Sequence, residues 1–399
     1  MFKYVLCKIL NITFRTISLT NTMKFSTNIL LILESSKINK NETTIKDLIL
    51  KINSWDIFIE LAFAHGVFPL VYNTLKTYTQ EIPAAIIIMM KQNYMNIVKE
   101  NMLMSAELVR VMHLLETNNI KAISFKGPLL SQMAYDDITS RQYADLDILV
   151  DDKDLYKAAN LLIANKYTNT SPISLLKNTT YLKVDNDFSF YTKNNIHIEL
   201  HWKLFREKIG LHMNFDEYYN NKSIVSVNNN PINTLKLELL FVYLCLHGSK
   251  HAWERVEWIN DIYMLTKNTK INWTETINIA KIMQCESSLY LGLNLVQKLY
   301  NKIPPKQLIL EVNSTYINEL TEEVFNFIED NLVQKKEYAK IKSFQAKLLN
   351  TKVKKIKHFI FHYISITKND YEAFPLPSYL RFLYYIIKPF RLIIKTIKK

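Results

Sequence analysis

Glycine is scarce in this sequence, and its scarcity excludes two common phosphate-binding designs. The 399 residues contain only 5 glycines, at Gly66, Gly127, Gly210, Gly248 and Gly292, and no two are close together. A Walker A loop or a GxGxxG turn needs clustered glycines, because the backbone must wrap closely around phosphate. Any nucleotide site in this chain therefore has another design.

Cysteine is nearly absent as well. The three cysteines, Cys7, Cys245 and Cys285, are far apart and form no CxxC pair. This distribution argues against a disulfide framework or a thiolate zinc site, and it suits a reducing cytosol.

Long uncharged apolar runs are also missing. No stretch reaches the roughly 20 residues that a membrane-spanning helix needs. The first residues, MFKYVLCKILNITFRTISLT, are interrupted by Lys3, Lys8 and Arg15, which makes them a poor signal peptide. We expect a cytoplasmic protein without a transmembrane segment, at most peripheral to the membrane.

Basic residues are in excess. The formal net charge is +13, and residues 351–399 contribute 11 Lys/Arg against 2 acidic residues, a net of +9. The end of this tail, YLRFLYYIIKPFRLIIKTIKK, alternates apolar, aromatic and basic residues. It could bind a nucleic-acid backbone or an anionic membrane surface, or it could be a helical pair that packs on the core with exposed lysines.

The pattern of apolar residues predicts an α+β or α/β chain of globular composition. A small mixed-sheet core is flanked by N- and C-terminal α-helical regions. The expected divisions are an uncertain N-terminal segment at 1–40, a helical region at 41–118, the α/β core at 119–230, a second helical region at 231–345 and the basic, aromatic tail at 346–399.

Local signals place the main elements of the core. A strand is predicted at 122–125, and Pro128 suits the first turn of a short helix that follows it. A second strand reads DLDILV, a helix follows at about 153–165, and two more strands at 187–192 and 196–202 enclose a hairpin-like turn. In the N-terminal region, Ser54 is a suitable N-cap for WDIFIELAFAH, and Gly66 is a suitable stop.

Two of these strands carry acids on one face. In DLDILV the alternation puts Asp145 and Asp147 on the same side, and in IHIELHW it puts Glu199 together with His197 and His201. If the strands are neighbours with their polar faces aligned, three carboxylates converge. They cannot stay ionised together without cations, and Mg²⁺ is a hard ion that suits such ligands. Two such ions serve in-line phosphoryl displacement. The plainer alternative is an amphipathic sheet with one solvated face.

The segment before the second strand supplies candidate phosphate binders. The start of the short helix presents unpaired N–H groups, Gly127 permits close approach of the backbone, and Lys126 adds a cation. Arg141 could bind phosphate with two N–H groups or could be a surface residue. His201 could orient a carboxylate or contact substrate, or could be a solvated strand residue.

Other polar and aromatic residues carry weaker signals. His247 and His251 lie four residues apart on a predicted helix, without the third ligand that a zinc site needs, so we expect them to pack or to line the cleft. Trp253, Trp258 and Asp261 are expected to be helix-packing residues.

The ordered set FKGPLL, SRQYADLDILV and IHIELHW resembles the uncharacterised nucleotidyltransferase family within the DNA polymerase beta superfamily. That superfamily's pattern is a glycine turn into a helix, a DxD strand, and a later strand with a third acid. The flanking stretches WDIFIELAFAHGVFPLVYNTL and HGSKHAWERVEWINDI resemble the family more weakly, so the resemblance covers roughly residues 50–265.

The resemblance implies a nucleotidyltransferase core in which Asp145, Asp147 and Glu199 bind Mg²⁺, with Lys126 and Gly127 near a triphosphate. Two departures stand out: Pro128 replaces the usual serine after the glycine, and Glu199 stands where the family often has aspartate. The expected function is Mg²⁺-dependent transfer of NMP from an NTP to an unidentified acceptor, with release of pyrophosphate. The alternative is a non-catalytic module of the same fold that binds nucleotide, RNA or a membrane surface.

Overall fold

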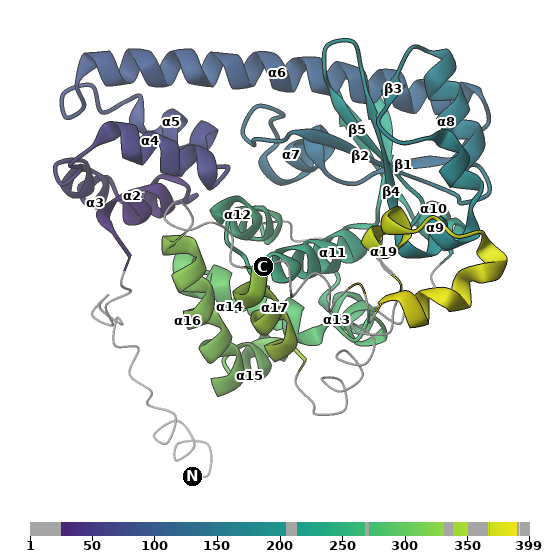
Figure 1. The fold of residues 1–399 in the computed structure, drawn as a ribbon. Helices are drawn as coiled ribbons and strands as arrows, with labels where there is room; N and C mark the ends of the chain where they lie inside the picture. Colours follow the sequence, from purple (N-terminus) through teal and green to yellow (C-terminus); the bar gives the residue numbers. More distant parts are fainter. Residues whose placement is uncertain are drawn as a thin grey trace, which may run out of the picture.

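The computed structural model describes residues 25–204, 214–267, 271–330, 338–349, 366, 368–388 and 391. It is a mixed α+β fold with a five-stranded sheet and a separate two-stranded hairpin. In Figure 1 the long helix α6 runs along the top, from a group of short N-terminal helices at one end to the sheet at the other, and the C-terminal helices lie beneath.

The N-terminal region is helical, as the apolar spacing predicts. Its elements are α2 (Thr27–Ser35), α3 (Glu42–Ile49), α4 (Trp55–Ala64), α5 (Phe68–Leu75) and α6 (Ala84–Thr117). The predicted start of α4 is confirmed, because the Ser54 side chain accepts a hydrogen bond from the Ile57 N–H at 3.4 Å. Gly66 follows the helix with φ of +71°, a left-handed conformation that glycine adopts without steric cost.

The main sheet has the order β1-β2-β5-β4-β3. Its strands are β1 (Ala122–Ser124), β2 (Asp145–Val150), β3 (Thr168–Asn169), β4 (Asp187–Tyr191) and β5 (His197–His201). β2 and β5 run parallel, and the other neighbouring pairs run antiparallel. Thus β2 and β5, the two strands that carry acids in the sequence, lie side by side in the centre.

The register of this parallel pair aligns the acids. Asp147 lies opposite Glu199, and Asp145 lies opposite His197. The alternate residues, such as Leu146 and Ile148, are buried on the other face of the sheet. The predicted alignment of the two polar faces is therefore confirmed.

Helices and short segments surround the sheet. They are α7 (Gly127–Tyr135), α8 (Leu155–Ala164), η1 (Ile173–Lys177), α9 (Thr179–Val184) and α10 (Phe215–Asn220). The second sheet, β6 (Ser223–Val227) and β7 (Asn230–Thr234), was not predicted. This hairpin crosses the expected boundary at residue 230, and the division into regions stays a prediction.

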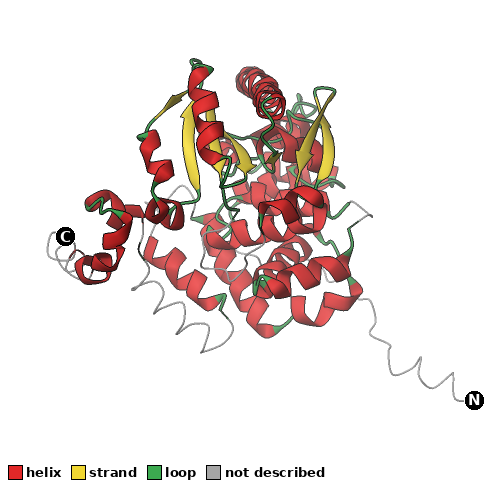
Figure 2. Cartoon of the chain, turned by 90° about the vertical axis from the view of Figure 1, so that its right-hand side faces the viewer, coloured by secondary structure: helices red, strands yellow, loops and turns green. Residues whose placement is uncertain are grey.

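The second helical region follows the hairpin. Its elements are α11 (Leu237–Lys250), α12 (Val256–Leu265), α13 (Trp273–Ile282), α14 (Glu286–Tyr300), η3 (Lys306–Leu308), α15 (Ile309–Val312), α16 (Thr315–Glu329) and α17 (Tyr338–Lys347). Figure 1 shows most of these helices below the strands, and in Figure 2 the strands again occupy the upper part of the molecule.

Two hydrophobic cores share α6. Its N-terminal half contributes Met90 and Ile97 to a core built mainly from helices. Its C-terminal half contributes Leu108 and Val111 to the core under the apolar face of the sheet. Between these halves, the buried Asn101 amide donates hydrogen bonds to two carbonyl groups in the segment before β2, those of Ile138 at 3.0 Å and Arg141 at 2.8 Å. The long helix therefore fixes the approach to the acid-bearing strand.

The described part of the C-terminal tail packs on the fold. It contains α19 (Lys368–Ala373) and η4 (Ser378–Leu383). The Tyr371 ring lies 5.8 Å from that of Tyr181 on α9. Lys388 and Arg391 both pair with the buried Asp370. This agrees with the packing alternative for these residues. Most of the basic residues of the tail lie outside the described residues, so binding to nucleic acid or to an anionic membrane stays a prediction.

Within the described residues, none of the helices combines the length and the apolar character needed to cross a bilayer. The first residues of the chain, which we expect to be a poor signal peptide, lie outside the described residues.

Candidate active site

The acid-bearing face of β2 and β5 gathers two overlapping groups of ligand atoms. One group consists of Asp145, His197 and Glu199, and the other consists of Asp147, Glu199 and His201. Within each group the ligand atoms all lie within 4.8 Å of one another. The predicted convergence of three carboxylates is thus present in the structure.

Asp147 lies at the centre and is completely buried. One of its oxygens, Oδ1, is 3.0 Å from Lys126 Nζ and 3.1 Å from His201 Nε2. Burial alone would raise the pKa of Asp147, but the charges of Lys126 and His201 outweigh it and hold that pKa well below its usual range. Asp147 is therefore ionised at neutral pH.

His201 contacts two of the acids through one ring nitrogen. Its Nε2 is also 3.3 Å from Glu199 Oε2, and its Nδ1 is 3.3 Å from the Asn186 side-chain amide. Burial opposes protonation, but the hydrogen bonds to Asp147 and Glu199 prevail and raise the pKa of His201 to about 9. The alternative of a solvated strand histidine is wrong, because His201 is buried.

The pKa values of the two outer acids shift in opposite directions. Burial, followed by repulsion from Asp147, raises the pKa of Asp145. The hydrogen bond from His201 lowers the pKa of Glu199, whose side chain keeps 25% of its exposure. Asp145 is thus the carboxylate with the least compensation, and it gains most from an added cation.

The donor set fits a hard divalent cation. Among the described residues, Asp147 Oδ2 is buried without a hydrogen-bond partner, although a buried carboxylate oxygen normally has one. Asp145 and Glu199 supply further oxygen ligands on the same face. Sequence reasoning did not select His197 as a ligand. Its place two residues before Glu199, on the same face, is the signal that could have identified it.

The start of α7 lies against this face. Gly127, the first residue of α7, has φ of +57°, and a Cβ there would lie 3.1 Å from the Asp145 carbonyl oxygen. No side chain caps the helix, and Lys126 is its N-cap residue. The unpaired N–H groups of the first turn and the Lys126 cation therefore lie beside the carboxylates, as an anion site requires.

Arg141 lies in a second buried cluster. Its Nε is 2.9 and 3.0 Å from the two carboxylate oxygens of Asp261 on α12. The Tyr135 hydroxyl donates to the same carboxylate at 3.0 Å. The alternative of a surface arginine is wrong, because Arg141 is buried. Asp261 has more than the packing role expected for it, since its carboxylate neutralises the buried guanidinium. The expected contact of Arg141 with phosphate stays a prediction.

Glu257 completes this cluster. It is buried on α12, and burial is the main cause that raises its pKa to about 7. Its carboxylate fills the space beside Gly66, where a Cβ would lie 1.9 Å from Glu257 Oε2. Gly66 is therefore required both for its left-handed backbone and for its missing side chain.

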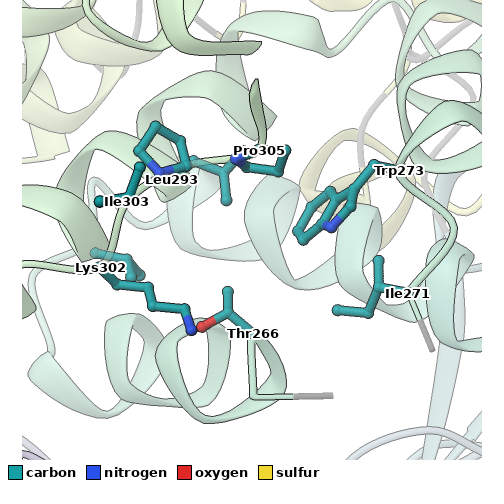
Figure 3. Close-up of a pocket in the computed structure, with 9 residues that line it drawn as sticks. Thr266, Ile271, Trp273, Leu293, Lys302, Ile303 and Pro305 are labelled. Atoms are coloured by element: carbon teal, nitrogen blue, oxygen red, sulfur yellow. The ribbon is translucent and has the colours of Figure 1, made fainter. Parts of the chain in front are cut away.

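A pocket of about 260 Å³ opens elsewhere, near the ends of α12, α13 and α14 (Figure 3). Thr266, Trp273, Leu293, Lys302 and Pro305 are among the residues that line it. Among the described residues, none that line this pocket is acidic, so the lining seen there does not share the chemistry of the carboxylate cluster.

Comparison with known families agrees with the geometry. The family described as "Uncharacterised nucleotidyltransferase" matches residues 52–301, which is more than half of the chain. The chain belongs to this uncharacterised nucleotidyltransferase family. The match includes the strands that carry Asp145, Asp147 and Glu199, the helix start at Gly127, and the helices α11 and α12.

Comparison with solved structures adds little to this assignment. The nucleotidyltransferase chain is similar to a structure titled "Crystal structure of an antigenic nucleotidyltransferase-like protein from Paracoccidioides brasiliensis", at 10% identity and a TM-score of 0.29. The similarity covers 46% of this chain and 91% of the other, and at this TM-score it carries no further argument. No curated protein matches the sequence.

Proposed function

We propose that this protein is a Mg²⁺-dependent nucleotidyltransferase that moves an NMP from an NTP to a hydroxyl group of an acceptor and releases pyrophosphate. The observation that carries the proposal is the parallel register of β2 and β5, which sets Asp147 opposite Glu199, with Asp145 and the start of α7 alongside.

Asp145, Asp147 and Glu199 would hold the metal. When bound, Mg²⁺ supplies positive charge to the attacking and leaving oxygens of an in-line phosphoryl displacement. The first turn of α7 binds phosphate oxygens through its N–H groups, and Lys126 adds its charge from the same side. His201 acts as a positioning residue, because its one nitrogen holds the carboxylates of Asp147 and Glu199 together.

The reaction is a substitution at the α-phosphorus. The acceptor oxygen forms a bond to this atom, and the bond between the α-phosphorus and the oxygen of pyrophosphate breaks. The proton of the acceptor hydroxyl passes to a base, and Glu199 is the best-placed group, since its carboxylate is ionised and partly exposed. The leaving pyrophosphate carries the displaced electron pair.

The direct test uses NTPs labelled at the α- or the γ-phosphate, incubated with Mg²⁺, the protein and fractions of a cell lysate. The expected result is transfer of the α-label to one acceptor, with stoichiometric pyrophosphate. Transfer of the γ-label alone would mean a kinase-type reaction and would reject the proposal. Nucleotide retention without pyrophosphate release, across all fractions, would favour the non-catalytic alternative. That alternative is motivated by Pro128, which stands in place of the superfamily's usual serine, and by the basic tail.

Matched variants make this test specific. Asp145→Asn and Asp147→Asn should abolish the Mg²⁺-dependent transfer, because each removes a metal-binding carboxylate. Asp152→Asn is the control, since Asp152 is an exposed acid just beyond the same strand. Transfer that persists in the first two variants would contradict the assignment of the site.

A further inference from the structure

Four aromatic or imidazole rings on α11, at its C-cap and on α12 have no role in the reaction proposed above. They belong to Tyr243, His247, His251 and Trp258, and together we call them the ring wall. The rings of His247 and His251 each lie against that of Trp258, with centroids 5.5 and 5.3 Å apart. Tyr243 and His247 are stacked, with their ring planes at 23°. The wall is therefore continuous over both helices.

The wall begins beside the carboxylates. Phe125, the residue before Lys126, is in edge contact with His201 at 5.3 Å and with Tyr243 at 5.3 Å. His201 in turn contacts Asp147. The Phe125 ring thus lies between Tyr243, the first ring of the wall, and His201, whose ring contacts the buried Asp147.

Its outer rings keep part of their exposure, although Trp258 also packs against the helical core. Tyr243 is buried against Phe125, but His247, His251 and Trp258 are only half-buried. Trp253, between the same two helices, is fully buried and shows how the fold places a tryptophan that only packs. Half-buried rings beside a phosphate-transfer site can accept another planar ring from solvent.

The charge of the wall suits a neutral aromatic ligand. Burial, with the nearby Lys126 as a second cause, lowers the pKa of His247 well below its usual value, so its imidazole is uncharged at neutral pH. Next to it, the Arg255 guanidinium lies 5.8 Å from the Trp258 ring centre. Stacking of a nucleobase on such rings contributes about 1–3 kcal/mol per base and tolerates any base.

We propose that the ring wall binds the nucleobase of the NTP by stacking, with His247 and Trp258 as the main contact surfaces. This inference rests on the proposed function, because the carboxylates and the start of α7 must hold the triphosphate. It assigns a binding surface to the nucleobase, which the groups that hold the triphosphate do not recognise. The wall lies on helices outside the sheet, so it selects for a ring without taking part in the bond-making step.

The test compares a ligand with a base and one without. The dissociation constants of ATP and of ribose 5-triphosphate are measured with Mg²⁺ by calorimetry, for the full chain and for His247→Ala and Trp258→Leu. ATP should bind the unaltered protein about 5- to 150-fold more tightly, which is 1–3 kcal/mol converted at 1.4 kcal/mol per tenfold. In either variant this ratio should fall toward one, while the affinity for ribose 5-triphosphate stays unchanged.

Two variants control for folding and position. His247→Phe keeps a ring at this position and should restore most of the preference for ATP. His113→Ala removes an exposed histidine on α6 and should change neither constant. Urea midpoints for all variants identify any that fail to fold. For the unaltered protein, ATP should also quench tryptophan fluorescence, and Trp258→Phe should reduce this quenching.

The outcomes separate the two proposals. Equal affinity of the unaltered protein for both ligands would overturn the ring wall and leave the transferase standing. If neither ligand binds, the proposed function itself fails. If the variants keep the preference for ATP but lose transfer to a base-containing acceptor, the wall belongs to the acceptor and the inference is wrong.

Discussion

Two neighbouring aspartates of the candidate site should respond in opposite ways to the same isosteric change. Asp147→Asn removes the buried negative charge that compensates Lys126 and His201, whose side chains are only 16% and 7% exposed. Breaking a buried ion pair by removal of one partner costs about 3–5 kcal/mol. Since folded domains are stable by only about 5–15 kcal/mol, Asp147→Asn should lose a large share of the free energy of unfolding.

Asp145→Asn should not have this cost. Burial and repulsion from Asp147 raise the pKa of Asp145, so the folded state disfavours its charged form. A neutral amide of the same shape relieves that repulsion, and the free energy of unfolding should stay the same or rise. Both variants should still lose transferase activity, because each lacks a metal-binding carboxylate.

The assay is urea unfolding at pH 7.5 in the presence of EDTA, followed by circular dichroism and tryptophan fluorescence. EDTA removes divalent ions, so the comparison reports only the charges of the protein. A midpoint for Asp145→Asn as low as that for Asp147→Asn would refute the reasoning. It would mean that the charge of Asp145 compensates Lys126 and His201 as much as that of Asp147 does.

Three further predictions concern the second buried cluster. Burial raises the pKa of Glu257 from 4.5 to about 7, so its contribution to stability is complete below about pH 4.5 and is lost as the pH rises through 7. In urea titrations, the free energy of unfolding of Glu257→Gln should therefore equal that of the unaltered protein near pH 4.5 and exceed it by about 3 kcal/mol at pH 8. The same difference in free energy at both pH values would contradict this. Gly66→Ala should destabilise by more than about 2 kcal/mol, because it combines a left-handed backbone with a Cβ 1.9 Å from Glu257 Oε2, and part of this loss should disappear in a Glu257→Ala background. Asp261→Asn leaves the Arg141 guanidinium buried without its carboxylate and should lower the free energy of unfolding by about 3–5 kcal/mol. Tyr135→Phe removes only one hydrogen bond and should lower it by about 1 kcal/mol. Equal urea midpoints for the two variants would argue against the ion pair.

The sequence predicts which face of a strand is polar better than it predicts which strands are neighbours. The period of two in DLDILV and IHIELHW is a local property, so it identifies the polar side that carries Asp147 and Glu199. The pairing of these strands is not local. It was assumed from the chemistry of converging acids, and the parallel register confirms it. The hairpin β6–β7 was missed although its strands are as long as β4 and β5, because both are partly exposed and β7 contains Pro231 and two asparagines, residue types that are depleted in strands.

The cations of the site were harder to predict. Lys126 meets Asp147 across 21 residues, and Arg141 meets Asp261 across 120. Such ion pairs depend on how the elements pack, and no spacing in the sequence encodes them. For this reason Arg141 was taken as a phosphate ligand or a surface residue, although the structure buries it.

The shared helix α6 has a mechanical consequence. It has 34 residues, which at 1.5 Å per residue is about 51 Å, and it belongs to both hydrophobic cores. One added residue near Asn101 would turn everything beyond it by about 100° relative to what comes before. Either Met90 and Ile97 or Leu108 and Val111 would then face water. Because one continuous helix belongs to both hydrophobic cores, neither core can unfold without exposing part of the other, and the two halves of the molecule should unfold in a single transition.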